Sequence, residues 1–459
     1  MSETKICFWS GLRTIGGNIA EIRYGNDRVI FDFGLVYNPA TSFVNRVTNR
    51  QAKYVSDLLR LDAIPRIDGL YRRDRLKYIQ SDERPLPYED SVYQTAVFIS
   101  HMHLDHMGAI DTIAPEIPVL MSKQSKQLYD VLDDVGEGLM RKRKVEAIAY
   151  ENQVQIGEIR VTPYQTDHDA YGAMAMLVET PDLTVLYSGD FRMHGQNPQW
   201  NMNLLRKMDD VDVDLLLIEG TTFRPEQVEA STEKRAVVHD EQEFAQALTS
   251  QLLDTNGLAF FNLYHRNIDR INHFINGAQD AGRTIVLELE TAHIADQLIN
   301  HVDFAILDDD AMKLKEQNLY ALQNKYRFVT SEEINEKPTK YIVQNSFGNS
   351  IKLLDYVFDN SIYIHANGMP LGAFDPEYQV LLNLLEHLDI RYQSFNISGH
   401  AYPEDVLEWV DRINPELLIP WHSHYPELIK PTSAKQAVFL PKKKTWYQFE
   451  EKQLKEIEE

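Results

Sequence analysis

The sequence predicts a multi-domain α/β protein, and three observations lead to that class. The chain has 459 residues, enough for two or three domains that each bury a core. Short apolar runs rich in strand-forming residues dominate its first third. From about Phe223 onward, predicted strands alternate with predicted helices, which is typical of a parallel sheet covered by helices.

The elements follow from these patterns in chain order. The strands expected in the first half are Lys5–Trp9, Asn18–Tyr24, Arg28–Phe33, Ala96–Ser100, Ile117–Met121, Ile159–Tyr164, Ala173–Glu179, Thr184–Ser188 and Leu215–Ile218. Residues 39–89 are expected to form an insertion with helical stretches such as Phe43–Leu59. Later elements include a helix at Arg266–Ala281 and a helix at Pro403–Ile413. The last residues, Glu450 to Glu459, are expected to form a charged, frayed helix.

Composition limits the classes of function. Lys and Arg number 46 against 69 Asp and Glu, a net charge of −23, which argues against a protein that coats nucleic acid. One local basic groove stays compatible with that balance. The single Cys7 excludes an intramolecular disulfide framework and a zinc site built from several thiolates. We find no signal peptide and no apolar run of about 20 residues, so we expect a cytoplasmic protein with no membrane span.

The strongest chemical signal is His101-Met102-His103-Leu104-Asp105-His106, directly after a predicted strand. Side chains two residues apart on an extended backbone point the same way, so His101 and His103 can bind one metal ion. Asp105 and His106 can then reach a second cation. Two adjacent metals would clamp the attacking and leaving oxygens of a displacement.

Further candidate ligands follow other predicted strands. They are His168, Asp190 and His422, with the Asp190 carboxylate well placed to bridge two metals. Taken singly, each is more often a packed or capping residue than a ligand. Their common placement at strand ends, where α/β proteins carry their sites, is what favours the metal hypothesis.

The order of these residues resembles a known family. Asp32 in Phe31-Asp32-Phe33-Gly34, the His101–His106 motif, His168, Asp190 and His422 resemble the five motifs of the metallo-β-lactamase superfamily. The stretch 216–222 is similar to the strand-plus-acid motif of the β-CASP nucleases, and 398–401 and 419–422 to their late His motifs. The stretches 262–271 and 398–424 resemble the ribonuclease J branch in particular.

That resemblance implies roles for individual residues. His101, His103 and His168 would hold one divalent metal, and Asp105, His106 and His422 the other, with Asp190 bridging. Asp32 would orient ligand imidazoles from behind. Asp105, Glu219 and His400 are the implied catalytic residues, and Glu219 and His400 would transfer protons at the scissile phosphate. Zinc is the expected metal and manganese the alternative, since His and carboxylate ligands suit both.

The chain also departs from the ribonuclease J pattern. The Ser/Gly-rich loop that recognises a terminal phosphate in that branch is matched only loosely by residues 344–350. Asn345 and Ser346 are kept as candidate phosphate contacts, as are His265 and Arg266 at a predicted helix start. Ser423-His424 replaces the usual Gly-Glu, and we expect the C-terminal domain of that branch to be missing after residue 446. These departures put 5′-exonuclease activity and assembly in doubt, and a homodimer is left open.

Weaker features are the basic clusters Arg72–Arg75, Arg141–Lys144 and Lys442–Lys444. Most such clusters are solvated helix faces, but these could also flank a groove that neutralises phosphates. His194 could line a cleft, although ordinary polar packing is the more frequent role.

We therefore predict a metallo-β-lactamase αββα sandwich built from residues 1–222 and 396–440, with a β-CASP-like α/β domain inserted at 223–395. Residues 441–459 are expected to be a charged tail. The predicted activity is metal-dependent hydrolysis of phosphodiesters, with single-stranded RNA bound in the inter-domain cleft. The alternatives are hydrolysis of a small ester, lactone or thioester, a DNA nuclease, and a scaffold that has lost its chemistry. The residues do not distinguish exonuclease from endonuclease action.

Overall fold

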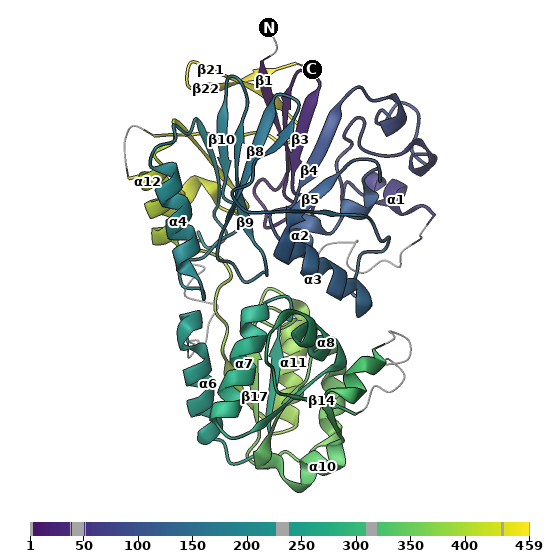
Figure 1. The fold of residues 1–459 in the computed structure, drawn as a ribbon, viewed down its shortest axis with the longest axis vertical. Helices are drawn as coiled ribbons and strands as arrows, with labels where there is room; N and C mark the ends of the chain where they lie inside the picture. Colours follow the sequence, from purple (N-terminus) through teal and green to yellow (C-terminus); the bar gives the residue numbers. More distant parts are fainter. Residues whose placement is uncertain are drawn as a thin grey trace.

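The computed structural model describes residues 3–36, 38, 50, 52–225, 238–308, 319–432 and 436–458. Its elements form two lobes, with both chain ends at the far side of the upper lobe (Figure 1). Two sheets form the upper lobe, and a third sheet with its helices forms the lower one. Within the described residues, no helix is both long and apolar enough to cross a membrane.

The first sheet has eight strands in the described part of the chain, in the order β22-β21-β1-β2-β3-β4-β5-β6. Strands β3 to β6 run parallel to one another, so their carboxyl ends meet at one edge. The bounds are β1 Thr4–Ser10, β2 Ile19–Tyr24, β3 Asp27–Phe31, β4 Gln94–Phe98, β5 Val119–Ser122, β6 Glu146–Ile148, β21 Trp446–Glu450 and β22 Gln453–Ile457.

The second sheet packs face to face against the first, in the order β20-β19-β11-β10-β9-β8-β7. Apolar side chains of both sheets, such as Phe31, Phe98 and Met176, form the core between them. The bounds are β7 Val154–Ile156, β8 Ile159–Gln165, β9 Met174–Glu179, β10 Thr184–Tyr187, β11 Leu215–Glu219, β19 Leu417–Trp421 and β20 Ala437–Val438.

Helices cover both outer faces of this sandwich. Helices α1 (Tyr54–Arg60), α2 (Leu104–Met107) and α3 (Lys123–Asp134) lie on the first sheet, and α4 (Pro198–Met208) and α12 (Pro403–Ile413) lie on the second. Each buries an apolar stripe against its sheet; on α12 this stripe includes Val406, Trp409 and Val410. The upper lobe is therefore a four-layer αββα sandwich.

The third sheet consists entirely of parallel pairs in the described residues, in the order β15-β14-β13-β16-β12-β17-β18. Parallel strands need crossover connections, and helices supply them on both faces. The strands are β12 Ala259–Leu263, β13 Thr284–Leu287, β14 Ala305–Leu307, β15 Arg327–Val329, β16 Tyr341–Gln344, β17 Ile362–Ala366 and β18 Arg391–Ser394. The helices are α6 Phe244–Leu253, α7 Ile268–Asp280, α8 Leu289–Leu298, α10 Ser331–Glu336 and α11 Pro376–His387.

Short 3-10 helices connect several of these elements. They are η1 Arg73–Arg75, η2 Tyr88–Asp90, η3 Ile110–Thr112, η4 Glu241–Glu243, η5 Tyr320–Asn324, η6 Pro338–Lys340, η7 Phe347–Asp355 and η8 Pro426–Leu428. The expected αββα sandwich with a further α/β sheet is confirmed.

The expected charged tail at 441–459 is wrong. Residues 446–457 form a β-hairpin that extends the first sheet, with β21 antiparallel to β1. Trp446 packs edge-on against Trp9 and lies under the guanidinium of Arg23. The aromatic residues Trp446, Tyr447 and Phe449 outweigh the charges of this segment because burial on the sheet edge stabilises a strand. About half of the expected helix Phe43–Leu59 lies outside the described residues, and the helix described in this region is α1.

Candidate metal centre

The candidate ligands gather at the strand ends of the sandwich that face the third sheet. The His101–His106 motif follows β4, His168 follows β8, Asp190 follows β10, and His422 follows β19. Strands β10, β11 and β19 are parallel and adjacent, so the residues that follow them meet at one edge. The tertiary structure thus brings together segments more than 300 residues apart.

A close backbone contact fixes the His101–His106 loop. Gly34 lies so near to Asp105 that a Cβ atom at position 34 would be 1.6 Å from the Asp105 carbonyl oxygen. The same loops exchange hydrogen bonds, with Phe33 N donating to the His106 carbonyl and Ala109 N donating to the Phe33 carbonyl. Glycine is therefore required after Asp32 and Phe33 for the motif to take its position.

Three imidazoles form the first group of candidate ligands. His101, His103 and His168 each offer a ring nitrogen within 4.8 Å of the other two. His168 Nε2 lies 3.2 Å from His103 Nδ1. Such an arrangement of three nitrogens matches the tridentate histidine sites of zinc proteins.

The second group contains Asp105, His106 and His422, and Asp190 lies between the two groups. His422 Nε2 is 3.2 Å from both His106 Nε2 and Asp105 Oδ2. Asp190 Oδ2 is 3.1 Å from His106 Nε2 and 3.7 Å from His101 Nε2. One carboxylate oxygen therefore reaches toward ligand atoms of both groups.

Hydrogen bonds behind the imidazoles determine which ring nitrogen faces inward. Asp32 Oδ2 lies 2.8 Å from His106 Nδ1, the Thr221 hydroxyl lies 2.7 Å from His422 Nδ1, and His168 Nδ1 donates to the Gly399 carbonyl. A proton held on Nδ1 leaves the lone pair of Nε2 free for a metal. Asp32 therefore lies behind the His106 imidazole, on the side of its Nδ1.

Asp32 and His422 also adopt a left-handed backbone conformation, with φ of 57° and 47°. This region is unfavourable for residues other than glycine and is often found at functional sites. Asp32 is held there by hydrogen bonds from Ser100 N, Ser100 Oγ and Tyr187 Oη to its carboxylate.

Burial and charge give the cluster its protonation preferences. Burial lowers the pKa of His101 well below its usual value and lowers that of His168 to about 3, so both imidazoles are neutral. Burial has the same tendency at His106, but Asp190, Asp105 and Asp32 raise the pKa of His106 well above normal. The three carboxylates around His106 thus stabilise a positive charge at this position.

Several buried ligand-type atoms lack a hydrogen-bond partner among the described residues. They are His101 Nε2, His103 Nε2, Asp169 Oδ1 and both carboxylate oxygens of Asp190. An unpaired buried polar atom costs about 1–3 kcal/mol, more when it is charged. Nitrogen and carboxylate donors of this kind fit a divalent cation, so the residues present are suited to hold one.

Glu219 and His400 form a hydrogen-bonded pair beside this cluster. His400 Nδ1 lies 2.9 Å from Glu219 Oε2, and Glu219 Oε1 accepts a hydrogen bond from Phe191 N. Burial lowers the pKa of His400, but the Glu219 carboxylate more than offsets it and raises this pKa to about 10. His400 is therefore a cationic donor at neutral pH. Each of the two residues also offers one ligand-type atom within 4.8 Å of such atoms of Asp190 and His422.

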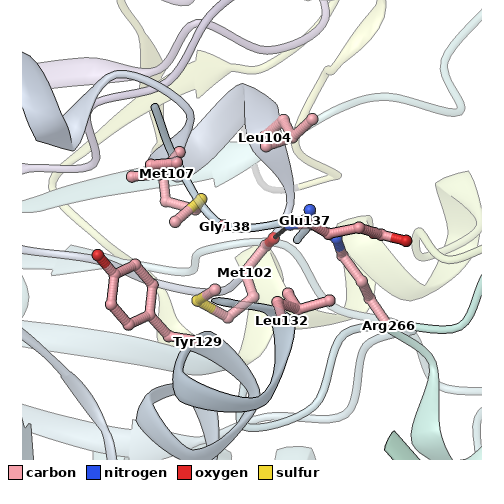
Figure 2. Close-up of a pocket in the computed structure, with 9 residues that line it drawn as sticks. Met102, Leu104, Met107, Tyr129, Leu132, Glu137, Gly138 and Arg266 are labelled. Atoms are coloured by element: carbon pink, nitrogen blue, oxygen red, sulfur yellow. Dashed lines mark hydrogen bonds between the residues drawn. The ribbon is translucent and has the colours of Figure 1, made fainter. Parts of the chain in front are cut away.

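The four candidate phosphate contacts already have partners in the protein. His265 Nε2 lies 2.8 Å from Glu137 Oε2, and Arg266 Nη1 donates to the Met102 carbonyl at 2.8 Å. Figure 2 shows Arg266 beside Met102 in the small pocket that Tyr129 and Leu132 also line. These two residues join the third-sheet lobe to the αββα sandwich.

The loop after β16 likewise forms internal contacts. Asn345 Nδ2 donates to the Asn349 carbonyl, and Ser346 N donates to Glu288 Oε1 at 2.9 Å. The Glu288 carboxylate is buried, and burial raises its pKa. A phosphate at this loop would have to displace these contacts and approach an acidic group.

The basic clusters are mostly engaged as well. Arg143 is buried and donates to the carbonyls of Ile110 and Ile117, which is a structural role. Arg72 and Arg73 form surface ion pairs with acidic neighbours. His194 Nε2 donates to the Ser398 carbonyl, and the His194 ring stacks on Tyr402. Both contacts are ordinary polar packing.

Sequence reasoning missed three residues of the site. Asp169 Oδ1 lies 3.3 Å from His168 Nε2 and 3.5 Å from His103 Nε2. Ser100 Oγ lies 3.0 Å from His101 Nδ1, and Thr221 contacts His422. The signal for Asp169 was its place directly after a candidate ligand; the two hydroxyls carry no signal that sequence reasoning could use.

Comparison with known proteins agrees with this geometry. Residues 61–259 match the family model described as "Beta-lactamase superfamily domain". This match, over fewer than half of the residues, supports a fold of the metallo-β-lactamase superfamily. The chain is 22% identical to "Ribonuclease J" of Pyrococcus abyssi, over 92% of this chain and 92% of that one. Its identity to "Ribonuclease J" of Mycoplasma genitalium is 21%, over 92% of this chain but 68% of that longer protein.

A solved structure extends the similarity to nearly the whole chain. The crystal structure of a protein of unknown function from Enterococcus faecalis V583 matches 97% of this chain and 99% of its own, with a TM-score of 0.79 and 28% identity. The fold, the His/Asp cluster and these relatives together support a hydrolase of the nuclease type, with a centre suited to divalent metal.

Proposed function

We propose that the protein is a ribonuclease J-like ribonuclease that uses two divalent metal ions to hydrolyse phosphodiester bonds in RNA. The observation that carries this proposal is the position of Asp190, whose carboxylate lies between the two ligand groups. Two groups that share one carboxylate are the expected arrangement for a dinuclear hydrolytic centre. The names of the relatives supply the substrate class.

The site residues divide into those that would bind metal ions and those that would transfer protons. His101, His103 and His168 would hold one cation, and Asp105, His106 and His422 the other, with Asp190 between them. Such cations, when bound, polarise a phosphoryl oxygen and lower the pKa of a water molecule. We expect zinc, with manganese as the alternative, since the donor set suits both.

His400 has the properties of a proton donor to the substrate. Its raised pKa keeps it protonated at neutral pH, and Glu219 holds its Nδ1, which leaves Nε2 as the free donor. A cationic imidazole stabilises charge on phosphate oxygens and can protonate a leaving oxygen. Asp105, the third predicted catalytic residue, contacts His422 and so acts within the ligand cluster.

We further propose that residues 1–222 and 396–440 form the lactamase-type domain and that 223–395 form an inserted domain of β-CASP type. The third sheet lies wholly within the second range, and α8 of this lobe contacts α3 of the first. Such a lobe would form one side of a cleft at the metal centre, and a polynucleotide substrate requires such a cleft. A small ester would not need that cleft.

The test compares substrates on metal-loaded protein. Zinc- or manganese-loaded wild type is incubated with 5′-monophosphorylated RNA, single-stranded DNA and a chromogenic ester. Asp190→Asn is the test variant, and Asp130→Asn on the exposed face of α3 is the matched control. RNA cleavage that is lost only in Asp190→Asn is expected. Ester turnover without RNA cleavage would refute the nuclease proposal, and cleavage of DNA alone would change its substrate class.

A further inference from the structure

A second concave site lies directly beside the candidate metal centre. It has a volume of about 240 Å³, and His168 forms part of its wall. The other walls come from the loop after β8, from α3 and α4, and from the first turn of α7. The hollow thus lies between the sandwich and the third-sheet lobe, and it shares His168 with the candidate metal centre.

Two polar groups in this hollow have no hydrogen-bond or ion-pair partner among the described residues. Thr166 is almost fully buried, and its hydroxyl has no hydrogen-bond partner among the described residues. Asp269, in the first turn of α7, forms no ion pair in the described part of the chain, and burial raises its pKa. The nearby cations Arg192 and Arg270 are bound instead to Glu241. Both groups are therefore available to a ligand.

The lining excludes a phosphate and favours a planar heterocycle. No Lys or Arg is found among the described residues that line the hollow, and the Asp269 carboxylate would repel an anion. Trp200 and Tyr171 offer aromatic surface, and Gln124 and Gln165 offer amide donors and acceptors. Aromatic stacking combined with polar contacts is how proteins hold unpaired nucleobases.

We propose that this hollow is a base-binding subsite that takes a guanine of the RNA strand next to the cleaved phosphodiester. The carboxylate of Asp269 accepts the two neighbouring donors of the guanine Watson–Crick edge, N1–H and the N2 amino group. Adenine and cytosine present one amino donor beside a ring acceptor, and uracil presents its single N–H between two carbonyls. The two carboxylate oxygens of Asp269, with no Lys or Arg among the described lining residues, therefore select guanine.

This inference deepens the proposed function and rests on it for the strand, but the subsite can be tested without catalysis. Nucleosides carry no phosphate, so their binding needs neither the metal centre nor turnover. Guanosine, adenosine, cytidine and uridine are titrated into the 459-residue protein by calorimetry. The variants are Asp269→Asn and, as the matched control, Asp280→Asn at the exposed end of the same helix.

Guanosine is expected to bind the wild type at least tenfold more tightly than uridine, the range for a two-bond contact to a base. Asp269→Asn should abolish that preference, and Asp280→Asn should retain it. Trp200→Leu should weaken all four nucleosides by a similar factor, because stacking is insensitive to base identity. Equal affinity of the wild type for all four nucleosides, or an unchanged preference in Asp269→Asn, overturns the subsite.

Mapping of cleavage sites separates this inference from the proposed function. On an RNA of mixed sequence, wild-type cuts should be enriched for guanine at one fixed offset, and the enrichment should vanish in Asp269→Asn. Cleavage with no base preference overturns the subsite and leaves the ribonuclease in place. Guanosine binding without any RNA cleavage overturns the ribonuclease and, with it, the strand that the subsite was proposed to read.

Discussion

Replacement of Glu241 by Gln probes one of the contacts that join the two lobes. Glu241 is fully buried and accepts two hydrogen bonds of 2.7 Å from Arg270 on α7. Its Oε2 also lies 3.3 Å from Arg192 Nη1, and Arg192 in turn contacts Asp167, the neighbour of His168. One carboxylate therefore connects the third-sheet lobe to the loop that carries a candidate ligand.

The expected loss of stability is large because the substitution leaves buried guanidinium groups without their anion. Each bond to a charged group is worth about 1.5–3 kcal/mol, and breaking a buried pair typically costs about 3–5 kcal/mol. Glutamine keeps one acceptor oxygen but turns an amide donor toward the arginines. We expect Glu241→Gln to lower the free energy of unfolding by about 3–5 kcal/mol at neutral pH.

The pH dependence of this loss has a definite sign. Burial would raise the pKa of Glu241, but Arg270 and Arg192 hold it well below the usual 4.5. A depressed folded pKa stabilises the fold above the unfolded pKa, and this contribution is lost as the pH falls through the folded value. The difference between wild type and Glu241→Gln should therefore be constant above pH 4.5 and shrink below it.

Urea denaturation followed by intrinsic fluorescence measures the effect. Glu243→Gln is the matched control, because Glu243 lies on the same 3-10 helix but is exposed. The control should stay within about 0.5 kcal/mol of wild type, as surface substitutions do. If Glu241→Gln matched the control at pH 7, the buried ion pair would not hold the lobes together as argued.

Three further predictions follow from the site and the core. His400→Ala and Glu219→Ala should each lower turnover by about 10²–10⁴-fold with near-normal metal content by elemental analysis; metal lost along with activity would make them ligands instead. Dialysis against a chelator should remove two metal ions per chain and lower the melting temperature, and a chain that takes up no zinc or manganese would contradict the dinuclear centre. Asp111→Asn should stabilise the protein by about 2–3 kcal/mol at pH 7.5, because burial raises the pKa of Asp111 to about 6 and its ionisation above that pH opposes folding. This gain should disappear by about pH 4 in denaturant titrations; an equal gain at both pH values would contradict the stated cause.

Local patterns were sufficient for much of the fold. The α12 prediction, 403–413, coincides with the observed helix because Pro403 at its first position and the apolar spacing specify it locally. The prediction for the C-terminal segment was wrong because its structure depends on a distant partner. Its charges indicated a frayed helix, whereas pairing of β21 with β1 stabilises a strand. No local signal reports a partner strand more than 400 residues away.

For the site, the sequence by itself determined which residue types are available and that they follow strands. It also placed them in an order that matches a superfamily. Only the tertiary structure decided that Asp190 lies between two ligand groups, that Asp169 reaches His103, and that Arg266 supports a backbone carbonyl instead of facing the centre. Distances between side chains depend on how sheets pack and where loops cross, and those are set by the core as a whole and not by any segment alone.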